Sequence, residues 1–224
     1  MFPLSDSHKT GKIPFITWGI IAANIAVFLY QLSLSNLDQF IGEYALTPAL
    51  VNWSNITALL PFLTSMFMHG GFMHIISNMW FLAVFGDNTE ARLGTTGYLL
   101  FYLVGGIVAS LTQYFFSLGS MIPMLGASGA VAAVLGFYLI QFPGSQIRTL
   151  VFYYSRISIY NVGAQTMIGL WALTQLLNSI GSIGAVASGG VAWFAHLGGF
   201  IFGVAVGLLL KKRVNPPFVS RISY

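Results

Sequence analysis

Ser128-Gly-Ala-Val-Ala-Ala-Val-Leu-Gly-Phe-Tyr-Leu-Ile-Gln-Phe142 is an apolar segment that opens with a hydroxyl side chain. As an α-helix rising about 1.5 Å per residue it would be roughly 22 Å long, whereas the hydrocarbon core of a bilayer is about 30 Å thick. Pro123 and Gly126 precede the segment and disfavour a longer helix. The sequence therefore predicts a short helix that begins below a membrane surface, where a loop dips in to meet it.

The composition supports a membrane setting for this segment. Hydrophobic residues make up 56% of the chain and charged residues only 6%, with a mean hydropathy of +0.80. These values are typical of a multi-span membrane protein and exclude an ordinary soluble domain. There is no cysteine and there are only four histidines, so we expect no structural metal. The net charge of +4 comes from scattered basic residues, so we expect no nucleic acid partner.

Apolar segments of spanning character recur along the chain. They cover about residues 14–34, 71–85, 97–118, 128–142, 162–180 and 191–210. The predicted fold class is an all-α polytopic membrane protein, a six-transmembrane-helix bundle with a short, submerged fourth helix and a long first external loop from Ser35 to about Ile56. We divide the chain into an N-terminal cytoplasmic segment (1–12), the membrane domain (13–210) and a basic cytoplasmic tail (211–224).

Charge placement gives an independent test of the six spans, because Lys and Arg gather on the cytoplasmic side of short loops. With six spans, every basic residue falls on one side: Lys9, Lys12, Arg92, Arg148, Arg156, Lys211, Lys212, Arg213 and Arg221. Both termini are therefore predicted to be cytoplasmic. The sequence lacks an Arg-rich and Ser-rich transit segment, which favours a bacterial plasma membrane.

Small residues predict which helices meet at Ser128. Ala132 and Gly136 follow Ser128 at four-residue spacing, and Gly199, Gly203 and Gly207 follow His196 on nearly one face. Such ridges let helix backbones approach closely in lipid. If the two ridges pack together, His196 lies beside Ser128 and can act as its general base. No carboxylate lies in these spans to orient the imidazole, so we expect a two-residue dyad.

Further polar groups lie near the same depth. His74 and Asn78 are four residues apart, hence on one helical face, and their N–H groups could stabilise an oxyanion beside Ser128. The backbone N–H of Ser128, at a submerged helix N-terminus, is a third donor. His69, which is followed by two glycines, is interpreted as fixing a loop. Taken singly, Ser128 could be a packing residue, and each of His74, Asn78 and His196 could merely hydrogen bond between helices.

Together these residues resemble the rhomboid intramembrane serine proteases, over about Phe62 to Leu210. The likeness is carried by His69-Gly-Gly-Phe-Met-His74-Ile-Ile-Ser-Asn78, by Gly126-Ala-Ser128-Gly129 and by Ala195-His196-Leu-Gly-Gly199. It implies a six-helix bundle with Ser128 as nucleophile, His196 as base, and His74, Asn78 and the Ser128 N–H as oxyanion donors. It also implies that Glu90 and Arg92 fix the turn after span 2. Substrates would be single-span membrane proteins, cut in or near the external end of their transmembrane segment without a cofactor.

Two departures from the family pattern qualify the resemblance. Many members have Trp-Arg in the first external loop where this chain has Leu60-Pro61, so the anchoring of that loop is open. Some members place a tyrosine four residues after the serine, where Ala132 stands here, so we expect His196 to be held less rigidly. The uncharged loop from Gly181 to Gly190 is interpreted as a mobile lid.

Two other functions remain open. The polar residues could line the path of a transporter or channel, although no Asp, Glu, Lys or Arg is embedded for ion coupling and no internal repeat is evident. An inactive rhomboid-like chaperone or adaptor is the other alternative. The sequence leaves the oligomeric state undetermined.

Overall fold

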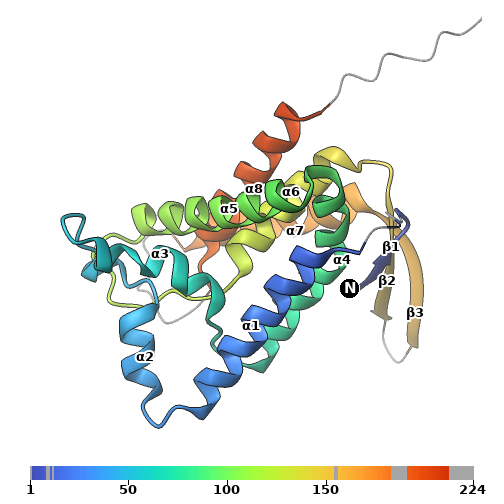
Figure 1. Ribbon diagram of the computed structural model, residues 1–224. Helices are drawn as coiled ribbons and strands as arrows, with labels where there is room; N and C mark the ends of the chain where they lie inside the picture. Colours follow the sequence, from blue (N-terminus) through green and yellow to red (C-terminus); the bar gives the residue numbers. More distant parts are fainter. Residues whose placement is uncertain (1, 9–10, 12, 154–155, 183–190, 212–224) are drawn as a thin grey trace, which may run out of the picture.

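The computed structural model of the protein is mostly helical (Figure 1), and it describes residues 2–8, 11, 13–153, 156–182 and 191–211. The helices are α1 (Phe15–Ser33), α2 (Leu37–Tyr44), α3 (Pro61–Thr64), α4 (Phe72–Leu93), α5 (Thr95–Phe116), α6 (Ser128–Gln141), α7 (Ala164–Gly181) and α8 (Trp193–Leu209). Single 3-10 turns lie at η1 (Pro48–Leu50), η2 (Ile56–Leu59) and η3 (Ser65–Phe67). The strands are β1 (Phe2–Asp6), β2 (Gln146–Tyr153) and β3 (Arg156–Gly163).

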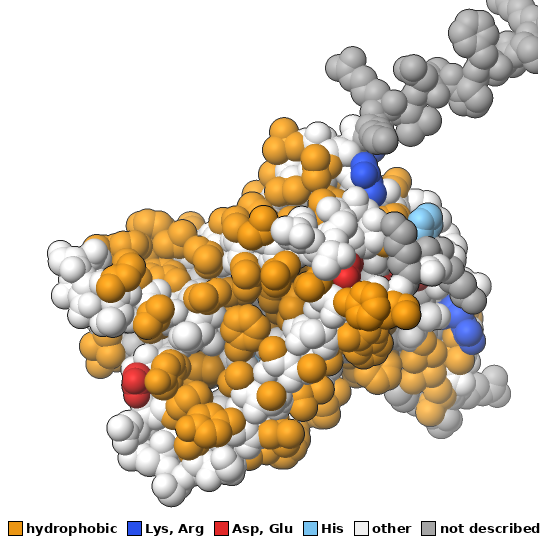
Figure 2. Space-filling model, viewed as in Figure 1, with side chains coloured by type: hydrophobic (Ala, Val, Ile, Leu, Met, Phe, Trp, Pro, Cys, Tyr) orange, Lys and Arg blue, Asp and Glu red, His pale blue; other side chains and the backbone are white. Residues whose placement is uncertain are grey.

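Six of these helices, α1 and α4 to α8, lie where the sequence predicts spans, and α4 continues beyond the predicted end at Phe85 to Leu93. By length and hydropathy, α1 and α5 can each cross a membrane. A third span is possible if η2 to η3 and α4, bent by 79°, count as one. Helices α6 and α8 are apolar but shorter. Hydrophobic side chains cover much of the face shown in Figure 2. The chain is therefore a helical, multi-pass membrane protein, and the number of six spans stays a prediction.

Helix α6 forms the centre of the bundle. Every residue from Gly129 to Tyr138 is buried, among α4, α5, α7 and α8. The contact with α8 is made by backbone, because a Cβ atom at Gly136 would overlap the carbonyl of Phe200 and one at Gly203 would overlap the carbonyl of Ala133. The predicted packing of small-residue ridges on these two helices is confirmed.

Two charged residues near the end of α4 hold neighbouring helices. The Glu90 carboxylate accepts hydrogen bonds from the backbone N–H groups of Ile16 and Thr17, at 3.0 and 2.8 Å, and so caps the start of α1. Arg92 donates from Nε to Gln141 Oε1 at 2.9 Å and from a terminal nitrogen to the Leu210 carbonyl at 2.8 Å. The two side chains thus join α4 to α1, to α6 and to the end of α8.

The long first loop is anchored without the Trp-Arg pair. The Trp53 indole donates to the Tyr114 hydroxyl on α5 at 3.1 Å, and both rings pack against Phe62. The backbones of Leu46 and Met124 pair as an isolated bridge. The loop is therefore tied both to α5 and to the segment that leads into α6.

The all-α prediction is wrong in one respect, because the chain contains an antiparallel sheet in the order β1-β2-β3. Strands β2 and β3 form a hairpin between α6 and α7, with Gln146 opposite Gly163, and β1 pairs with β2 so that Phe2 lies opposite Leu150. Part of the predicted N-terminal segment (1–12) is thus a strand of this sheet, Phe2–Asp6. A hydropathy window of span length cannot detect strands of this size. The signal is the alternation in Gln-Ile-Arg-Thr-Leu, whose Ile147 and Thr149 are buried.

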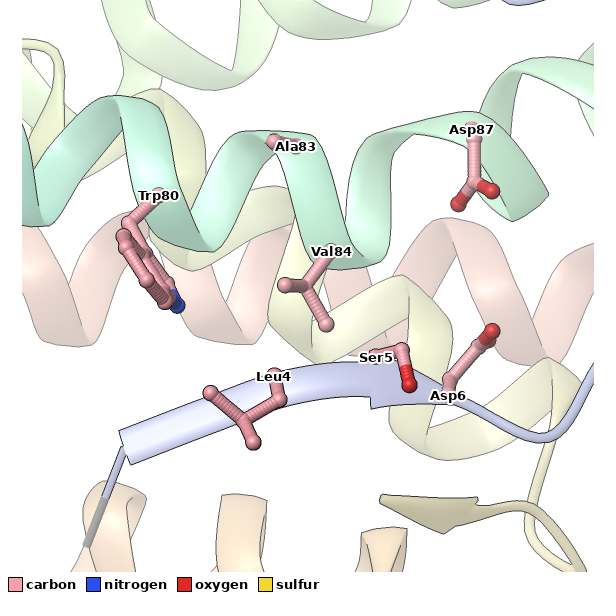
Figure 3. A pocket seen from close by; sticks show the side chains of 7 residues that line it. All are labelled: Leu4, Ser5, Asp6, Trp80, Ala83, Val84 and Asp87. Atoms are coloured by element: carbon pink, nitrogen blue, oxygen red, sulfur yellow. The ribbon is translucent and has the colours of Figure 1, made fainter. Parts of the chain in front are cut away.

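A cavity of about 320 Å³ lies between β1 and α4 (Figure 3). Its lining is Leu4, Ser5, Asp6, Trp80, Ala83, Val84 and Asp87, and none of these is a predicted site residue. The Trp80 indole donates to the Pro3 carbonyl, and the Asp6 carboxylate accepts from Asn88 and Tyr138. These polar contacts hold β1 against the bundle.

The docking of β1 should depend on pH. Burial raises the pKa of Asp6 above its ordinary value of 3.8, and the hydrogen bond from Tyr138 offsets only part of that rise. Since the raised pKa belongs to the docked state, docking should weaken as pH rises from 3.8 through the raised pKa. Amide hydrogen exchange of residues 2–6, corrected for intrinsic rates, should show this loss of protection in the wild type. Asp6→Asn should reduce the dependence and leave the part that is due to Asp87, which lines the same cavity, whereas an equal dependence in both proteins would contradict the assignment.

Candidate functional site

Ser128 and His196 lie in hydrogen-bonding contact. Ser128 is the first residue of α6, His196 is in the first turn of α8, and His196 Nε2 is 2.7 Å from Ser128 Oγ. This close approach requires glycine at position 199, because a Cβ atom there would overlap the carbonyl of Gly129. The structure thus brings together the serine and the histidine that the sequence analysis predicts to lie side by side.

The other imidazole nitrogen also has a partner, which sequence reasoning missed. His196 Nδ1 is 2.7 Å from Oε1 of Gln175 on α7. The indoles of Trp171 and Trp193 flank the imidazole, each with its ring centroid 6.1 Å away. These residues surround the ring where Ala132 offers no aromatic side chain, and the expectation that His196 is held less rigidly stays a prediction. A search of span 5 for polar residues at helical spacing could have found Gln175.

The turn that carries Ser128 is fixed by backbone contacts. Gly126 N–H donates to the Ser65 carbonyl at 2.9 Å, and Gly126 has φ of +132°, a conformation that L side chains rarely adopt. The N-cap residue Ala127 supplies no side-chain bond to the first turn of α6. The N–H groups of this turn, including that of Ser128, therefore lack intrahelical acceptors.

His74 lies against the same turn. A Cβ atom at Gly126 would be only 2.7 Å from His74 Cε1 and Nε2. His74 Nδ1 accepts a long hydrogen bond, 3.5 Å, from Gly70 N–H. If Nδ1 is the acceptor, Nε2 of the neutral ring carries the hydrogen. His74 then presents an N–H donor toward Gly126 and Ser128.

Asn78 follows His74 by one turn of α4 and is buried. Among the described residues, its Nδ2 has no hydrogen-bond acceptor. Leaving a buried donor unpaired costs about 1–3 kcal/mol, so such a group is a candidate to meet a ligand. The role of Asn78 as an oxyanion donor stays a prediction.

His69 has a different setting. Its backbone N–H donates to Gln31 Oε1 at 3.0 Å, and its carbonyl accepts from Gln31 Nε2 at 3.2 Å. Its imidazole is buried edge-on to that of His74, and neither ring nitrogen has a partner among the described residues. These contacts fit the interpretation of His69 as a residue that fixes a loop, here by binding to α1.

The space beside Ser128 is small. A cavity of about 20 Å³ is lined by Ser128 and, among others, Ser65, Ser110, Gly126 and Gly129. This volume is about enough for one water molecule, and the serine hydroxyls supply polar partners. In the part of the chain that the structure describes, no three His, Asp or Glu residues are grouped so as to hold a metal ion. The predicted lid falls mainly on residues 183–190, which lie outside the described ranges.

The protein is therefore a helical membrane protein with a candidate nucleophile inside its bundle. This nucleophile is a serine that contacts an imidazole at the start of a short buried helix. Residues 57–213 match the family model of the Rhomboid domain. The chain belongs to the rhomboid family.

Curated relatives share this membership. The chain is 28% identical to "Rhomboid protein 1, mitochondrial" of Saccharomyces cerevisiae, over 89% of this chain and 54% of the yeast protein. It is 30% identical to "Presenilin-associated rhomboid-like protein A, mitochondrial" of Danio rerio, over 90% of this chain and 48% of that protein. It is 25% identical to "RHOMBOID-like protein 1" of Arabidopsis thaliana, over 89% and 54%. The chain spans about half the length of these relatives.

Gly126→Ala tests the geometry of the turn. The added Cβ would meet His74 at 2.7 Å and would place alanine at a φ of +132°, so the turn and His74 must move apart. A displacement of about 1 Å can cost on the order of 100-fold in rate. Labelling of Ser128 by a fluorophosphonate should slow accordingly. Gly19→Ala is the matched control, because a Cβ at Gly19 meets nothing within 4 Å. Equal labelling of both variants would contradict this role of Gly126.

Proposed function

We propose that this chain is an intramembrane serine endopeptidase that cleaves single-span membrane proteins in or near their transmembrane segment. The observation that carries the proposal is the 2.7 Å approach of His196 Nε2 to Ser128 Oγ inside an apolar bundle. Membership of the rhomboid family supports it. The names of the relatives state no activity, so the chemistry is argued from the residues.

In the proposed acylation step, Ser128 Oγ attacks the carbonyl carbon of the scissile peptide bond while His196 Nε2 takes the hydroxyl proton. The carbonyl oxygen becomes an oxyanion, stabilised by N–H groups of Ser128, His74 and Asn78. His196 then returns the proton to the leaving amine as the carbon–nitrogen bond breaks. An acyl ester on Ser128 remains.

Deacylation repeats these steps with water as the nucleophile. His196 takes a proton from a water molecule whose oxygen attacks the ester carbonyl, and the same donors stabilise the second oxyanion. Collapse of this intermediate breaks the ester bond and returns the proton to Ser128 Oγ. The small cavity beside Ser128 offers a place from which water can enter the reaction.

The proposed topology follows the basic residues, with both termini cytoplasmic and Ser128 opening toward the external side. The bacterial plasma membrane expected from the sequence gains no support from the relatives, two of which are named as mitochondrial. We therefore propose the orientation of the bundle and leave the membrane unnamed. The oxyanion donors, the pairing of Ser128 with His196 and the single-span substrates are parts of the same proposal.

Two experiments test the activity. Purified protein in liposomes should cleave a single-span reporter, and Ser128→Ala should abolish cleavage while the protein stays folded. A fluorophosphonate should label wild type at Ser128 and fail to label His196→Ala. Transport of a solute without labelling would instead favour a conduit. A folded protein with neither labelling nor cleavage would favour the inactive chaperone or adaptor.

Asn78→Ala should slow cleavage strongly without unfolding the protein. Removing one oxyanion donor typically costs on the order of 100-fold in kcat, or about 3 kcal/mol. The loss should be in kcat rather than KM, because the donor acts on charge that forms during the reaction. Ser77→Ala on the exposed face of α4 is the control, since its hydroxyl donates only to the His74 carbonyl. An unchanged kcat in Asn78→Ala would remove Asn78 from the proposed site.

A further inference from the structure

We infer that Gln175 is a positioning residue that holds the imidazole of His196 in the form able to accept the Ser128 proton. The inference deepens the proposed function and rests on it. Its basis is the contact of Gln175 Oε1 with His196 Nδ1 at 2.7 Å, on the opposite side of the ring from Ser128. The polar constellation is thus Ser128, His196 and Gln175, contributed by α6, α8 and α7.

The orientation of the Gln175 amide is fixed by its neighbours on α7. Its Nε2 lies 3.2 Å from Thr174 Oγ1 and 3.4 Å from the Trp171 carbonyl. The Thr174 hydroxyl donates its proton to the same carbonyl at 2.6 Å, so its oxygen is free to accept from the amide. A flipped amide would place Oε1 against the carbonyl oxygen of Trp171. The acceptors of α7 therefore direct Gln175 Oε1 at His196.

This orientation selects the tautomer of His196. An amide oxygen can only accept, so His196 Nδ1 must carry the hydrogen and donate it to Gln175. In a neutral imidazole, Nε2 then holds the lone pair, which faces Ser128 Oγ as a general base requires. The opposite tautomer would set two acceptors, Nδ1 and Oε1, against each other. Gln175 thereby biases the ring toward the reactive form.

An amide suits this position because both groups are buried, with His196 9% and Gln175 7% exposed. Burying an unpaired carboxylate costs much more than burying a hydrogen-bonded amide. Gln175 supplies the acceptor without a charge. Ser179, one turn further along α7, donates to the Gln175 carbonyl at 2.8 Å, so it bonds the backbone of this residue and not its amide.

The test combines a spectroscopic and a kinetic measurement on the full chain. Gln175→Met removes the acceptor at similar volume, Gln175→Glu restores an acceptor oxygen, and Ser179→Ala is the control on the same helix. In protein with ¹⁵N-labelled histidine, the His196 signals are assigned with His196→Ala. We expect Nδ1 protonated and Nε2 unprotonated in wild type and Ser179→Ala, and a mixture of tautomers in Gln175→Met.

The kinetic arm uses reporter cleavage in liposomes. In Gln175→Met we expect kcat to fall about tenfold, the factor for roughly 1.4 kcal/mol, with KM nearly unchanged. Gln175→Glu should recover part of the loss, and Ser179→Ala should keep the wild-type kcat. If Gln175→Met does not fold, Thr174→Val tests the inference in its place, because Thr174 is exposed and its replacement should leave the fold intact. Loss of the Thr174 hydroxyl should loosen the Gln175 amide and shift the His196 tautomers in the same direction as Gln175→Met.

Unchanged tautomers in folded Gln175→Met, or a fall in kcat equalled by Ser179→Ala, would overturn the inference. The tautomer measurement does not need turnover. A wild type that neither cleaves nor reacts with a fluorophosphonate would defeat the proposed function, whereas the spectra would still report whether Gln175 orients His196.

Discussion

The contact between the backbones of α6 and α8 is the constraint on which the rest of the structure depends. Glycines at 136, 199 and 203 let carbonyl groups of one helix occupy the space where the other would carry Cβ atoms. Helix α6 has 14 residues, roughly 21 Å, so it cannot cross a bilayer alone and begins inside the fold. The same glycines that allow dense packing therefore bring a hydroxyl and an imidazole together at a buried helix start.

The distribution of charge follows from the cost of removing ions from water. Around Ser128 the polar partners are uncharged side chains, namely imidazole, carboxamide and hydroxyl groups, each of which can be buried if hydrogen bonded. The carboxylates and the guanidinium that hold the helices, Glu90, Asp6 and Arg92, lie at the other ends of α4 and α6, where chain ends and the sheet meet. The candidate site is thus assembled from uncharged polar groups, and hydrogen bonds of charged side chains hold the helices together at the far end.

The sequence predicted the parts of this arrangement that follow helical periodicity. Ser128 and His196 could be paired because small residues mark one face of each helix, and the start of α6 could be placed because the helix is short. Gln175 could not be paired with His196, since nothing in the spacing of span 5 fixes its rotation relative to span 6. The sheet was missed because its alternation has period two and is too short for a span-length window.

Ser128 and His196 differ in what holds them. Ser128 is fixed through backbone on both sides: the turn before it is bonded to Ser65 and, through Met124, to Leu46 of the first loop, and the helix after it is packed on α8. The orientation of the His196 ring depends instead on side chains of α7, above all Gln175. A displacement of α7 would therefore leave the Ser128 hydroxyl in place and remove the Gln175 contact of the His196 imidazole, so the tautomer of this ring is the feature of the pair most sensitive to α7.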